Sequence, residues 1–363
     1  MKTNDIIAEG EPGTPGNLHR DKALLPNLDG IRAVACLLVV LNHSPAPMPI
    51  RLMGEIGVGL FFVLSGFLMS YLYAQASWNV KAVSLYCIAR FSRIAPIYWL
   101  VITICIAISY VTNDSEFDMR IMGLTQIMRH YLFGGSVGIF WSISPEIQYY
   151  IFFLFIWFTI AHRAMKSYLL PLLAFTCAGF LLTHNYWPGL TLPHKLHFFL
   201  AGTIAGALPR AQWILPIEKN ILPFLQVGAI ILLIAPAFFY ATIIEFYKVT
   251  ELGIVYAVAV YLLSLPTRWT TFAFASPVMR RIGQASFSIY LMHVLVFYFG
   301  QSFLGLSNTT YEPLWILLIL AGVVLPMIAS RYIEIPLQKM TRKFLLRCLQ
   351  PWLLRKQFEV VPV

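Results

Sequence analysis

The sequence is poor in charged residues. Asp, Glu, Lys and Arg make up only 12% of its 363 residues, whereas an ordinary soluble domain has about 25%. Hydrophobic residues make up 59%, and the mean hydropathy is +0.73. This composition excludes an ordinary water-soluble domain and is typical of a polytopic integral membrane protein.

Acidic residues are especially scarce. There are 16 Asp and Glu residues against 26 Lys and Arg residues, so the formal net charge is +10. The basic residues are spread over many loops and do not gather on one basic face, as they do in nucleic-acid-binding domains. We therefore expect no nucleic-acid partner, and the lipid bilayer is the partner that the composition predicts.

Cysteine patterns and nucleotide-binding loops are missing as well. The cysteines are odd in number and show no CxxC or Cys/His metal spacing, which excludes a disulfide framework and predicts no metal site; they are Cys36, Cys87, Cys105, Cys177 and Cys348. No Walker-type or GxGxxG loop occurs. We therefore expect neither ATP hydrolysis nor a permanently bound cofactor.

What the chain does have is a series of long apolar runs. We count ten that are long enough, or nearly long enough, to span a bilayer: Leu28 to His43, Ile56 to Tyr73, Ile94 to Val111, Ile143 to Ala161, Tyr168 to Thr183, Leu196 to Leu208, Ile221 to Ile244, Leu252 to Leu265, Ala285 to Leu304 and Leu314 to Ser330. The sixth and eighth are short. The predicted fold is all-α, with about ten transmembrane helices and no convincing internal repeat.

Charge placement predicts the orientation of these helices. If both termini are cytoplasmic, all but five of the 26 Lys and Arg residues fall on the inner side, as the positive-inside rule requires. The five outer residues are Arg51, Arg120, Arg129, Lys195 and Lys248.

The two ends of the chain differ from its middle. Residues 1–27 have Gly and Pro but no apolar core, which predicts a disordered cytoplasmic tail and not a signal peptide. Residues 28–335 form the predicted membrane domain. Residues 336–363 form a basic cytoplasmic tail, which either contacts anionic headgroups as an amphipathic segment or is simply solvated.

The first run carries the ionisable residues Arg32 and His43 in its apolar stretch. Eleven residues separate them, so both side chains lie on one helix face, about 16 Å apart along the axis. Burying ionisable groups in hydrocarbon costs free energy, so their presence calls for a function. One interpretation is therefore a pair of functional residues that acts across the membrane. The other is a snorkelling Arg and a packed, hydrogen-bonded His.

The second and third runs depart from plain lipid-facing sequence. Gly57, Gly59 and Gly66 permit the close approach of another helix or of a ligand. Arg90 and Arg93 share a helix face at the predicted inner edge, where they either bind phosphate or form a basic anchor.

The fourth and ninth runs add more polar residues. Ser144 and Pro145 fit an N-cap and a first helical turn, which places Glu146 in that turn, at a depth similar to His43. Glu146 is then either a partner of the imidazole or a capping carboxylate. His293 near mid-membrane is catalytic, substrate-binding or hydrogen-bonded to a neighbouring helix.

Together these segments resemble the acyltransferase-3 family of integral membrane O-acyltransferases. Six family motifs occur in order between Leu28 and Lys343: Leu28 to Arg32 followed by His43, Phe61 to Phe67, Arg90 with Arg93, Trp141 to Glu146, Ser286 to His293, and Tyr332 to Pro336. The chain departs from the family pattern at Pro145, which precedes Glu146, and at Ile147, where the family commonly has a second Glu. The chain resembles a stand-alone member, without a hydrolase-like extracytoplasmic domain.

The resemblance implies roles for individual residues. The donor is a cytoplasmic acyl-CoA, most simply acetyl-CoA, bound by Arg90, Arg93 and Ser65. His43 is the predicted general base, with Glu146 orienting it or replacing it and Arg32 as the third catalytic residue. The predicted substrate-binding residues are Asp29, Trp141, Tyr149, Tyr290 and His293. Direct transfer and an acyl-enzyme route both stay open.

The sequence contains no motif that identifies the acceptor. A hydroxyl of a surface or exported glycan is the first expectation, and a secreted small molecule such as a macrolide is the second, with a bacterial inner membrane as the location. The alternatives from other classes are a secondary transporter or flippase of lipid-linked sugars and an inactive relative that serves as an interaction platform. The oligomeric state is not predicted.

The predicted orientation can be tested with a fusion. A reporter placed after Val363 should be active only in its cytoplasmic form, because the positive charges hold that end inside. The measurement is a paired comparison of one reporter that works in the cytoplasm and one that works outside. An externally active fusion would mean that one of the short runs does not span.

Overall fold

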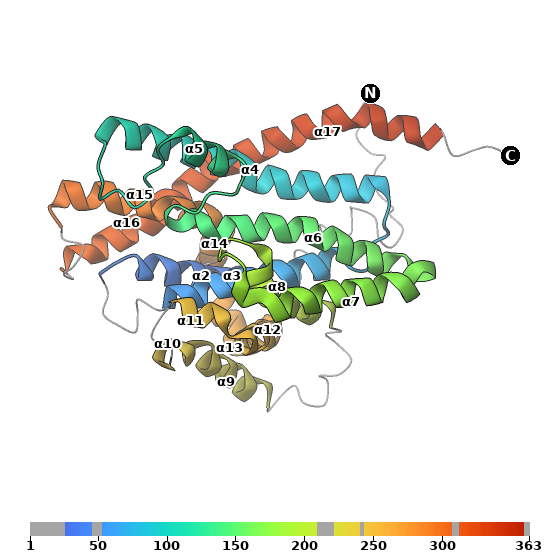
Figure 1. The fold of residues 1–363 in the computed structure, drawn as a ribbon. Coiled ribbons are helices and arrows are strands. Elements are labelled where there is room, and N and C mark those ends of the chain that lie inside the picture. The colour runs from blue at the N-terminus through green and yellow to red at the C-terminus, as the bar shows by residue number, and fades with distance from the viewer. Residues whose placement is uncertain (1–25, 46–52, 209–220, 240–242, 307–311, 359–363) are drawn as a thin grey trace, which may run out of the picture.

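A computed structural model describes residues 26–45, 53–208, 221–239, 243–306 and 312–358 (Figure 1). Within these ranges the secondary structure is helical and contains no strand. The predicted class, an all-α polytopic membrane protein, is confirmed.

The helices follow one another with short connections. In the first half they are α2 (Pro26–Asn42), α3 (Met53–Tyr73), α4 (Val80–Thr112), α5 (Leu124–Tyr131), η3 (Gly138–Ser142), α6 (Ile143–Ala161), η4 (Arg163–Met165) and α7 (Lys166–Thr183). In the second half they are η5 (His184–Tyr186), α8 (Leu192–Ala207), α9 (Leu222–Ile234), α10 (Pro236–Phe239), α11 (Ile243–Lys248), α12 (Thr250–Ser264), α13 (Arg268–Phe274), α14 (Pro277–Gln284), α15 (Ser286–Leu304), α16 (Leu314–Ala329), η6 (Ser330–Glu334) and α17 (Ile335–Phe358).

Each predicted apolar run overlaps at least one of these helices. Within the described ranges, seven helices are long and apolar enough to cross a membrane, or eight if α12 and α13, bent by 103°, form one span. Helices α2 and α8 are shorter, with 17 and 16 residues. The count of ten and the location of the termini therefore stay predictions.

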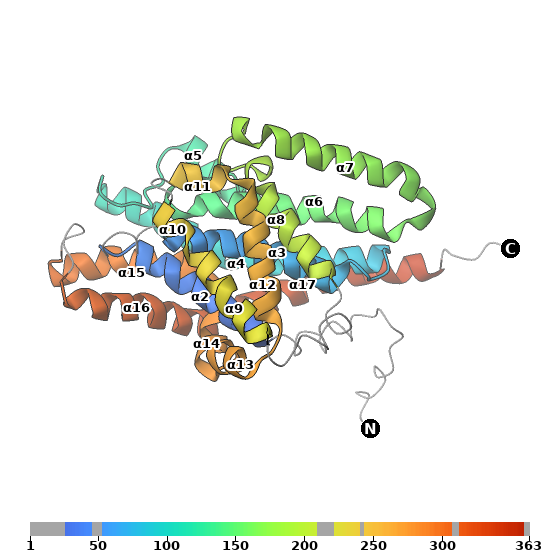
Figure 2. The ribbon, with the colours of Figure 1, turned by 90° about the horizontal axis from the view of Figure 1, so that it is seen from below.

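Helix α3 is the centre of the bundle. It packs against α2, α8 and α12, and most of its residues are buried. Helix α7, by contrast, has no buried residue and lies on one flank, opposite α13 and α14 (Figure 2). We call the two ends of the bundle the Asp29 end and the His43 end, after residues at the start of α2 and just beyond its last turn.

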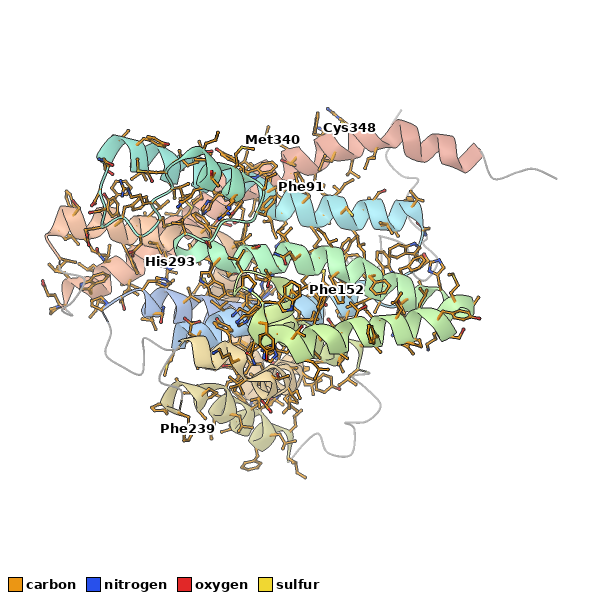
Figure 3. All side chains as sticks on the ribbon, viewed as in Figure 1. Phe91, Phe152, Phe239, His293, Met340 and Cys348 are labelled. Atoms are coloured by element: carbon orange, nitrogen blue, oxygen red, sulfur yellow. The ribbon has the colours of Figure 1, made fainter. Side chains whose placement is uncertain are left out.

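The outside of the bundle is apolar. Large hydrophobic side chains on peripheral helices are exposed, such as Phe175, Phe224 and Phe239, at 78%, 77% and 82%. Figure 3 shows Phe239 pointing away from the core. A soluble monomer rarely shows apolar patches of this extent. The exposed face is the one that contacts lipid in a membrane protein.

Close backbone contact holds α3 against α8. A Cβ atom at Gly66 would lie 2.1 Å from the carbonyl oxygen of Phe199, and one at Gly202 would lie 2.1 Å from that of Val63. No side chain fits at these distances. The partner that the α3 glycines admit here is therefore a helix, which resolves the alternative left open by the sequence.

The structure describes the two predicted tails to different extents. Residues 1–25 of the first lie outside the described residues, but Asn27 belongs to α2 and is buried, where its amide donates to the carbonyl of Leu263. The second, residues 336–363, is helical as α17 through Phe358. It continues α16 through the π-helix η6, in which Glu334 accepts hydrogen bonds from Ser288 and Ser330.

The glycine contact between α3 and α8 predicts a stability difference. Gly66→Ala should lower the free energy of unfolding by about 1–3 kcal/mol, because the methyl group overpacks a backbone contact. Gly179→Ala on α7 is the matched control, since nothing lies within 4 Å of its added Cβ. The control should leave stability unchanged or raise it by up to about 1 kcal/mol. Unfolding midpoints in detergent measure both, and equal midpoints would contradict the packing.

Candidate functional site

Helix α2 positions two predicted site residues at opposite ends of the bundle. Arg32 lies near its start and lines cavities toward the Asp29 end, whereas His43 follows its last residue and lines a cavity at the other end. The backbone N–H of His43 still bonds to the carbonyl of Val39, which extends the last turn of α2.

A small central cavity lies among α3, α4, α6 and α15, with an accessible volume of about 60 Å³. Its polar lining contains predicted catalytic, donor-binding and substrate-binding residues from five helices: Arg32, Ser65, Arg90, Arg93, Glu146 and Tyr290. The rest of the lining is largely apolar and includes Phe61, Phe62 and Leu64.

Glu146 is held by two hydroxyl groups. Ser65 Oγ donates to its Oε1 at 2.9 Å, and the Tyr150 hydroxyl donates to the same atom at 2.5 Å. The expected contact between Glu146 and His43 is therefore wrong, since the two residues line different cavities. The assumption that failed is that equal depth in the membrane means lateral contact.

Helix α6 also begins slightly earlier than expected. Its first residue is Ile143, so Ser144 lies inside the helix and is not its N-cap. Ser144 Oγ instead accepts a hydrogen bond from the Gln148 amide at 2.9 Å. Glu146 remains in the first turn of α6, as expected.

Three arginines connect the central cavity to a larger one at the Asp29 end. Arg32, Arg90 and Arg93 line both, and the second cavity has an accessible volume of about 320 Å³. The Arg90 guanidinium lies 5.8 Å from the ring centroid of Tyr73 and 5.7 Å from that of Tyr150, as in cation–π contacts. The structure thus groups the arginines where a polyanion entering from this end would pass.

His43 and His293 form a pair at the other end. Their ring centroids are 4.9 Å apart, and His293 Nε2 lies 3.2 Å from His43 Nδ1. His293 on α15 is completely buried inside the bundle (Figure 3), whereas His43 is exposed to the cavity. The sequence offered His293 as one of several possibilities and did not pair it with His43.

Backbone carbonyls fix the tautomers of this pair. His293 Nδ1 lies 2.9 Å from the carbonyl oxygen of Ile289, and His43 Nδ1 lies 2.9 Å from that of Val39. A carbonyl can only accept, so both Nδ1 atoms carry hydrogen. Nε2 of His293 is then an acceptor toward His43, and Nε2 of His43 carries the free lone pair of a base.

The cavity beside His43 is acidic. It has an accessible volume of about 370 Å³, and the described part of its lining contains Glu116 and Asp118 but no Lys or Arg. The nearby Asp114 accepts from the Glu116 backbone N–H and from the Tyr298 hydroxyl, which lowers the pKa of the Asp114 carboxyl. Sequence reasoning missed these residues, although three carboxylates close together in a chain poor in acids were a readable signal.

The remaining predicted substrate-binding residues have different surroundings. Tyr290 lines the central cavity and is hydrogen-bonded to Ser142 at 2.6 Å. Tyr149 is a correction: it is completely buried, hydrogen-bonded to Thr203 and stacked on Phe199, so it packs the core and reaches none of the three cavities described here.

Trp141 does not line these three cavities either. Its ring faces the ammonium group of Lys195, 5.2 Å from the ring centroid, and the same nitrogen lies 3.3 Å from the ring centroid of Tyr247. Lys195 is 3% exposed, although its place in the sequence predicts a cation on the outer side. Trp141 therefore forms part of the surroundings of a buried lysine.

Comparisons with known proteins match most of this chain to a family and to named relatives. A family model described as "Acyltransferase domain" matches residues 25–331. The relative named "Putative O-acetyltransferase SACOL0978" of Staphylococcus aureus (strain COL) is 23% identical over 353 residues, which cover 87% of this chain and 57% of the relative. "Peptidoglycan O-acetyltransferase OatA" of Listeria monocytogenes serovar 1/2a is 24% identical over 360 residues, covering 87% and 56%.

The chain thus spans little more than half the length of these curated relatives. No solved structure matches it significantly.

The histidine pair generates a spectroscopic prediction. In ¹⁵N-histidine-labelled protein, at a pH where the ring is neutral, His43 should be protonated at Nδ1 and not at Nε2. His293→Ala should leave a mixture of tautomers, because one of the two acceptors for the Nδ1 proton is lost. Ring ¹⁵N shifts report the tautomer directly. A predominant Nε2–H form in the unaltered protein would contradict the arrangement.

Proposed function

This chain belongs to the acyltransferase domain family, and from that membership we propose that it transfers an acetyl group from cytoplasmic acetyl-CoA to a hydroxyl of a glycan outside the membrane. The single observation that carries the proposal is the opposition of two cavities, one lined by arginines and one by a histidine base, at the two ends of α2.

The Asp29 end suits the donor. CoA carries several phosphate charges, and guanidinium groups bind phosphate through charge-assisted, bidentate hydrogen bonds. Arg32, Arg90 and Arg93 line the passage between the two cavities of this end. With this end on the cytoplasmic side, the polyanionic part of the donor stays near water, and only its neutral acyl-pantetheine arm enters the central cavity.

The His43 end suits the acceptor. Its cavity is of the size that takes a small ligand, and its polar lining can bind hydroxyl groups through Asn42, Ser44 and Gln301. Glu116 and Asp118 oppose a negatively charged acceptor, so a neutral or amino-bearing sugar is favoured. The printed name of one relative, a peptidoglycan O-acetyltransferase, supports a glycan of the cell envelope, and hence a bacterial inner membrane.

The reaction needs a base, because a neutral hydroxyl is a poor nucleophile. His43 Nε2 takes the proton of the acceptor hydroxyl, and the oxygen of that hydroxyl attacks the thioester carbonyl. The C–S bond then breaks and releases CoA as the thiolate. His293 acts as a positioning residue that, together with the carbonyl of Val39, fixes the tautomer of His43. The negative charge of Asp118 in the same cavity favours the imidazolium that forms.

Donor and acceptor sites are close to each other along α15. Tyr290 lines the central cavity, and His293, three residues later, contacts His43. Three residues correspond to a rise of about 4.5 Å along a helix. The acyl group therefore has about one helical turn of protein to pass, either directly or through an acyl-enzyme intermediate.

The assignment of the base predicts the effect of a substitution. His43→Ala should lower acetyl transfer on the order of 100-fold or more while leaving expression and acetyl-CoA binding nearly intact. His43→Gln should fare no better, because an amide cannot take up the proton. Transfer is measured with radiolabelled acetyl-CoA and envelope glycan as acceptor.

His162→Ala is the matched control. The ring of His162 also bonds through Nδ1 to the carbonyl four residues before it, but it lies at the end of α6 and lines none of the three cavities. Its substitution should leave turnover near normal. Near-normal turnover in either His43 variant would remove His43 as the base and leave Glu146 or His293 in that role.

A further inference from the structure

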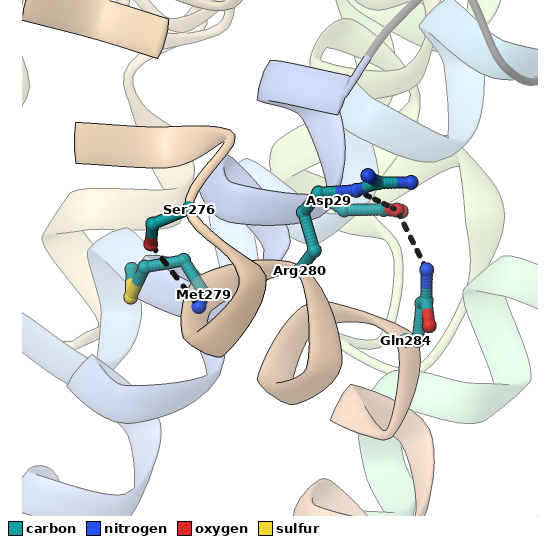
Figure 4. A network of polar contacts seen from close by, with 5 residues as sticks. All are labelled: Asp29, Ser276, Met279, Arg280 and Gln284. Atoms are coloured by element: carbon teal, nitrogen blue, oxygen red, sulfur yellow. Dashed lines mark hydrogen bonds and ion pairs between the residues drawn. The ribbon is translucent and has the colours of Figure 1, made fainter. Parts of the chain in front are cut away.

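Helix α14 forms one wall of the Asp29-end cavity and packs directly on the first turn of α2. A Cβ atom at Gly283 would lie only 1.8 Å from the carbonyl oxygen of Asp29, so the two helix backbones touch at this point. The start of α14 is fixed by Ser276, whose Oγ accepts from the Met279 backbone N–H at 3.4 Å (Figure 4).

This contact places two side chains of α14 around one carboxylate. Gln284 donates to Asp29 Oδ2 at 3.2 Å, and Arg280, one turn earlier, places its Nε 4.0 Å from the same oxygen (Figure 4). Both residues line the Asp29-end cavity. Asp29 therefore serves here as an anchor for α14 side chains, which gives a structural reason for an acidic residue at this position of α2.

Only one edge of the Arg280 guanidinium faces Asp29. The ion pair involves Nε, and the terminal nitrogens of Arg280 have no acceptor among the described residues. The side chain is 46% exposed. A guanidinium held at its Nε edge presents its two terminal nitrogens as a fork, the geometry that binds a phosphate group in a bidentate manner.

The order of the arginines matches the order of charges along CoA. Arg32, Arg90 and Arg93 lie where the central cavity meets the Asp29-end cavity, whereas Arg280 lines only the latter. A thioester in the central cavity places the pantetheine arm first, the pyrophosphate next, and the 3′-phosphate on the adenosine ribose last. The pyrophosphate then meets the three shared arginines, and the 3′-phosphate lies farther out.

We propose that Arg280, positioned by Asp29, binds the 3′-phosphate of CoA and thereby selects CoA over donors that lack this phosphate. The inference rests on the proposed function, because it takes acetyl-CoA as the donor. Arg280 is then a determinant of donor specificity, distinct from the arginines that bind the pyrophosphate.

The test uses CoA and dephospho-CoA, which lacks only the 3′-phosphate, with the purified full-length chain in detergent. Binding is measured by calorimetry. The unaltered protein should bind CoA about tenfold more tightly than dephospho-CoA, as expected for one charge-assisted contact at a partly exposed site. Arg280→Ala should weaken CoA binding by about the same factor and leave dephospho-CoA binding unchanged, which also shows that the variant is folded.

Three further variants give the contrast. Arg281→Ala removes the same charge from the neighbouring exposed residue, which does not line the cavity, and should change neither affinity. Arg93→Ala should weaken the binding of CoA and of dephospho-CoA by similar factors, since Arg93 contacts the pyrophosphate that both ligands share. Arg280→Lys should recover only part of the preference for CoA, because the planar fork is lost.

The outcomes separate the two proposals. If the unaltered protein binds both nucleotides but does not distinguish them, or if Arg280→Ala weakens both equally, Arg280 does not bind the 3′-phosphate and the donor assignment stands. If the unaltered protein binds neither, acyl-CoA is not the donor and the inference falls with it.

Discussion

Backbone contact around α2 is the constraint on which the rest of the structure depends. At Gly57 an added Cβ would lie 2.4 Å from the carbonyl oxygen of Ala35, and at Gly283 it would lie 1.8 Å from that of Asp29. These contacts press α3 and α14 onto α2 over much of its length. A short helix thereby holds an arginine at one end of the bundle and a histidine at the other, and all three cavities are built around it.

Much of this arrangement follows from local sequence rules. Helical spacing was enough to predict that Arg32 and His43 lie toward opposite ends of one helix, and that Arg90 and Arg93 share a face, because both are properties of single helices. The contacts between helices do not follow from such local rules. His43 and His293 are 250 residues apart, and Ser65 and Glu146 are 81 apart, so no periodicity relates them. Depth in the membrane fixed one coordinate of each residue and left its angular position around the bundle undetermined, which is why a contact between Glu146 and His43 was one of the two interpretations of Glu146.

The same limit explains the other corrections. Tyr149 lies in a polar-looking segment next to Glu146, yet its helix angle turns it toward Phe199 and away from the cavities. Lys195 looks like a loop cation in the sequence, but it belongs to α8 and its charge is accommodated by the aromatic faces of Trp141 and Tyr247. In both cases tertiary packing decided the position, and the sequence pattern alone could not.

The partition between the cavities has a consequence for the membrane. The central cavity and the His43-end cavity share no lining residue, and the completely buried His293 lies next to both Tyr290 and His43. In the part of the chain that the structure describes, packed side chains around His293 separate the two cavities. In the proposed function the acyl group crosses this packed layer while the layer limits the leak of protons and ions, whereas a transporter with alternating openings limits that leak by closing one gate before it opens the other.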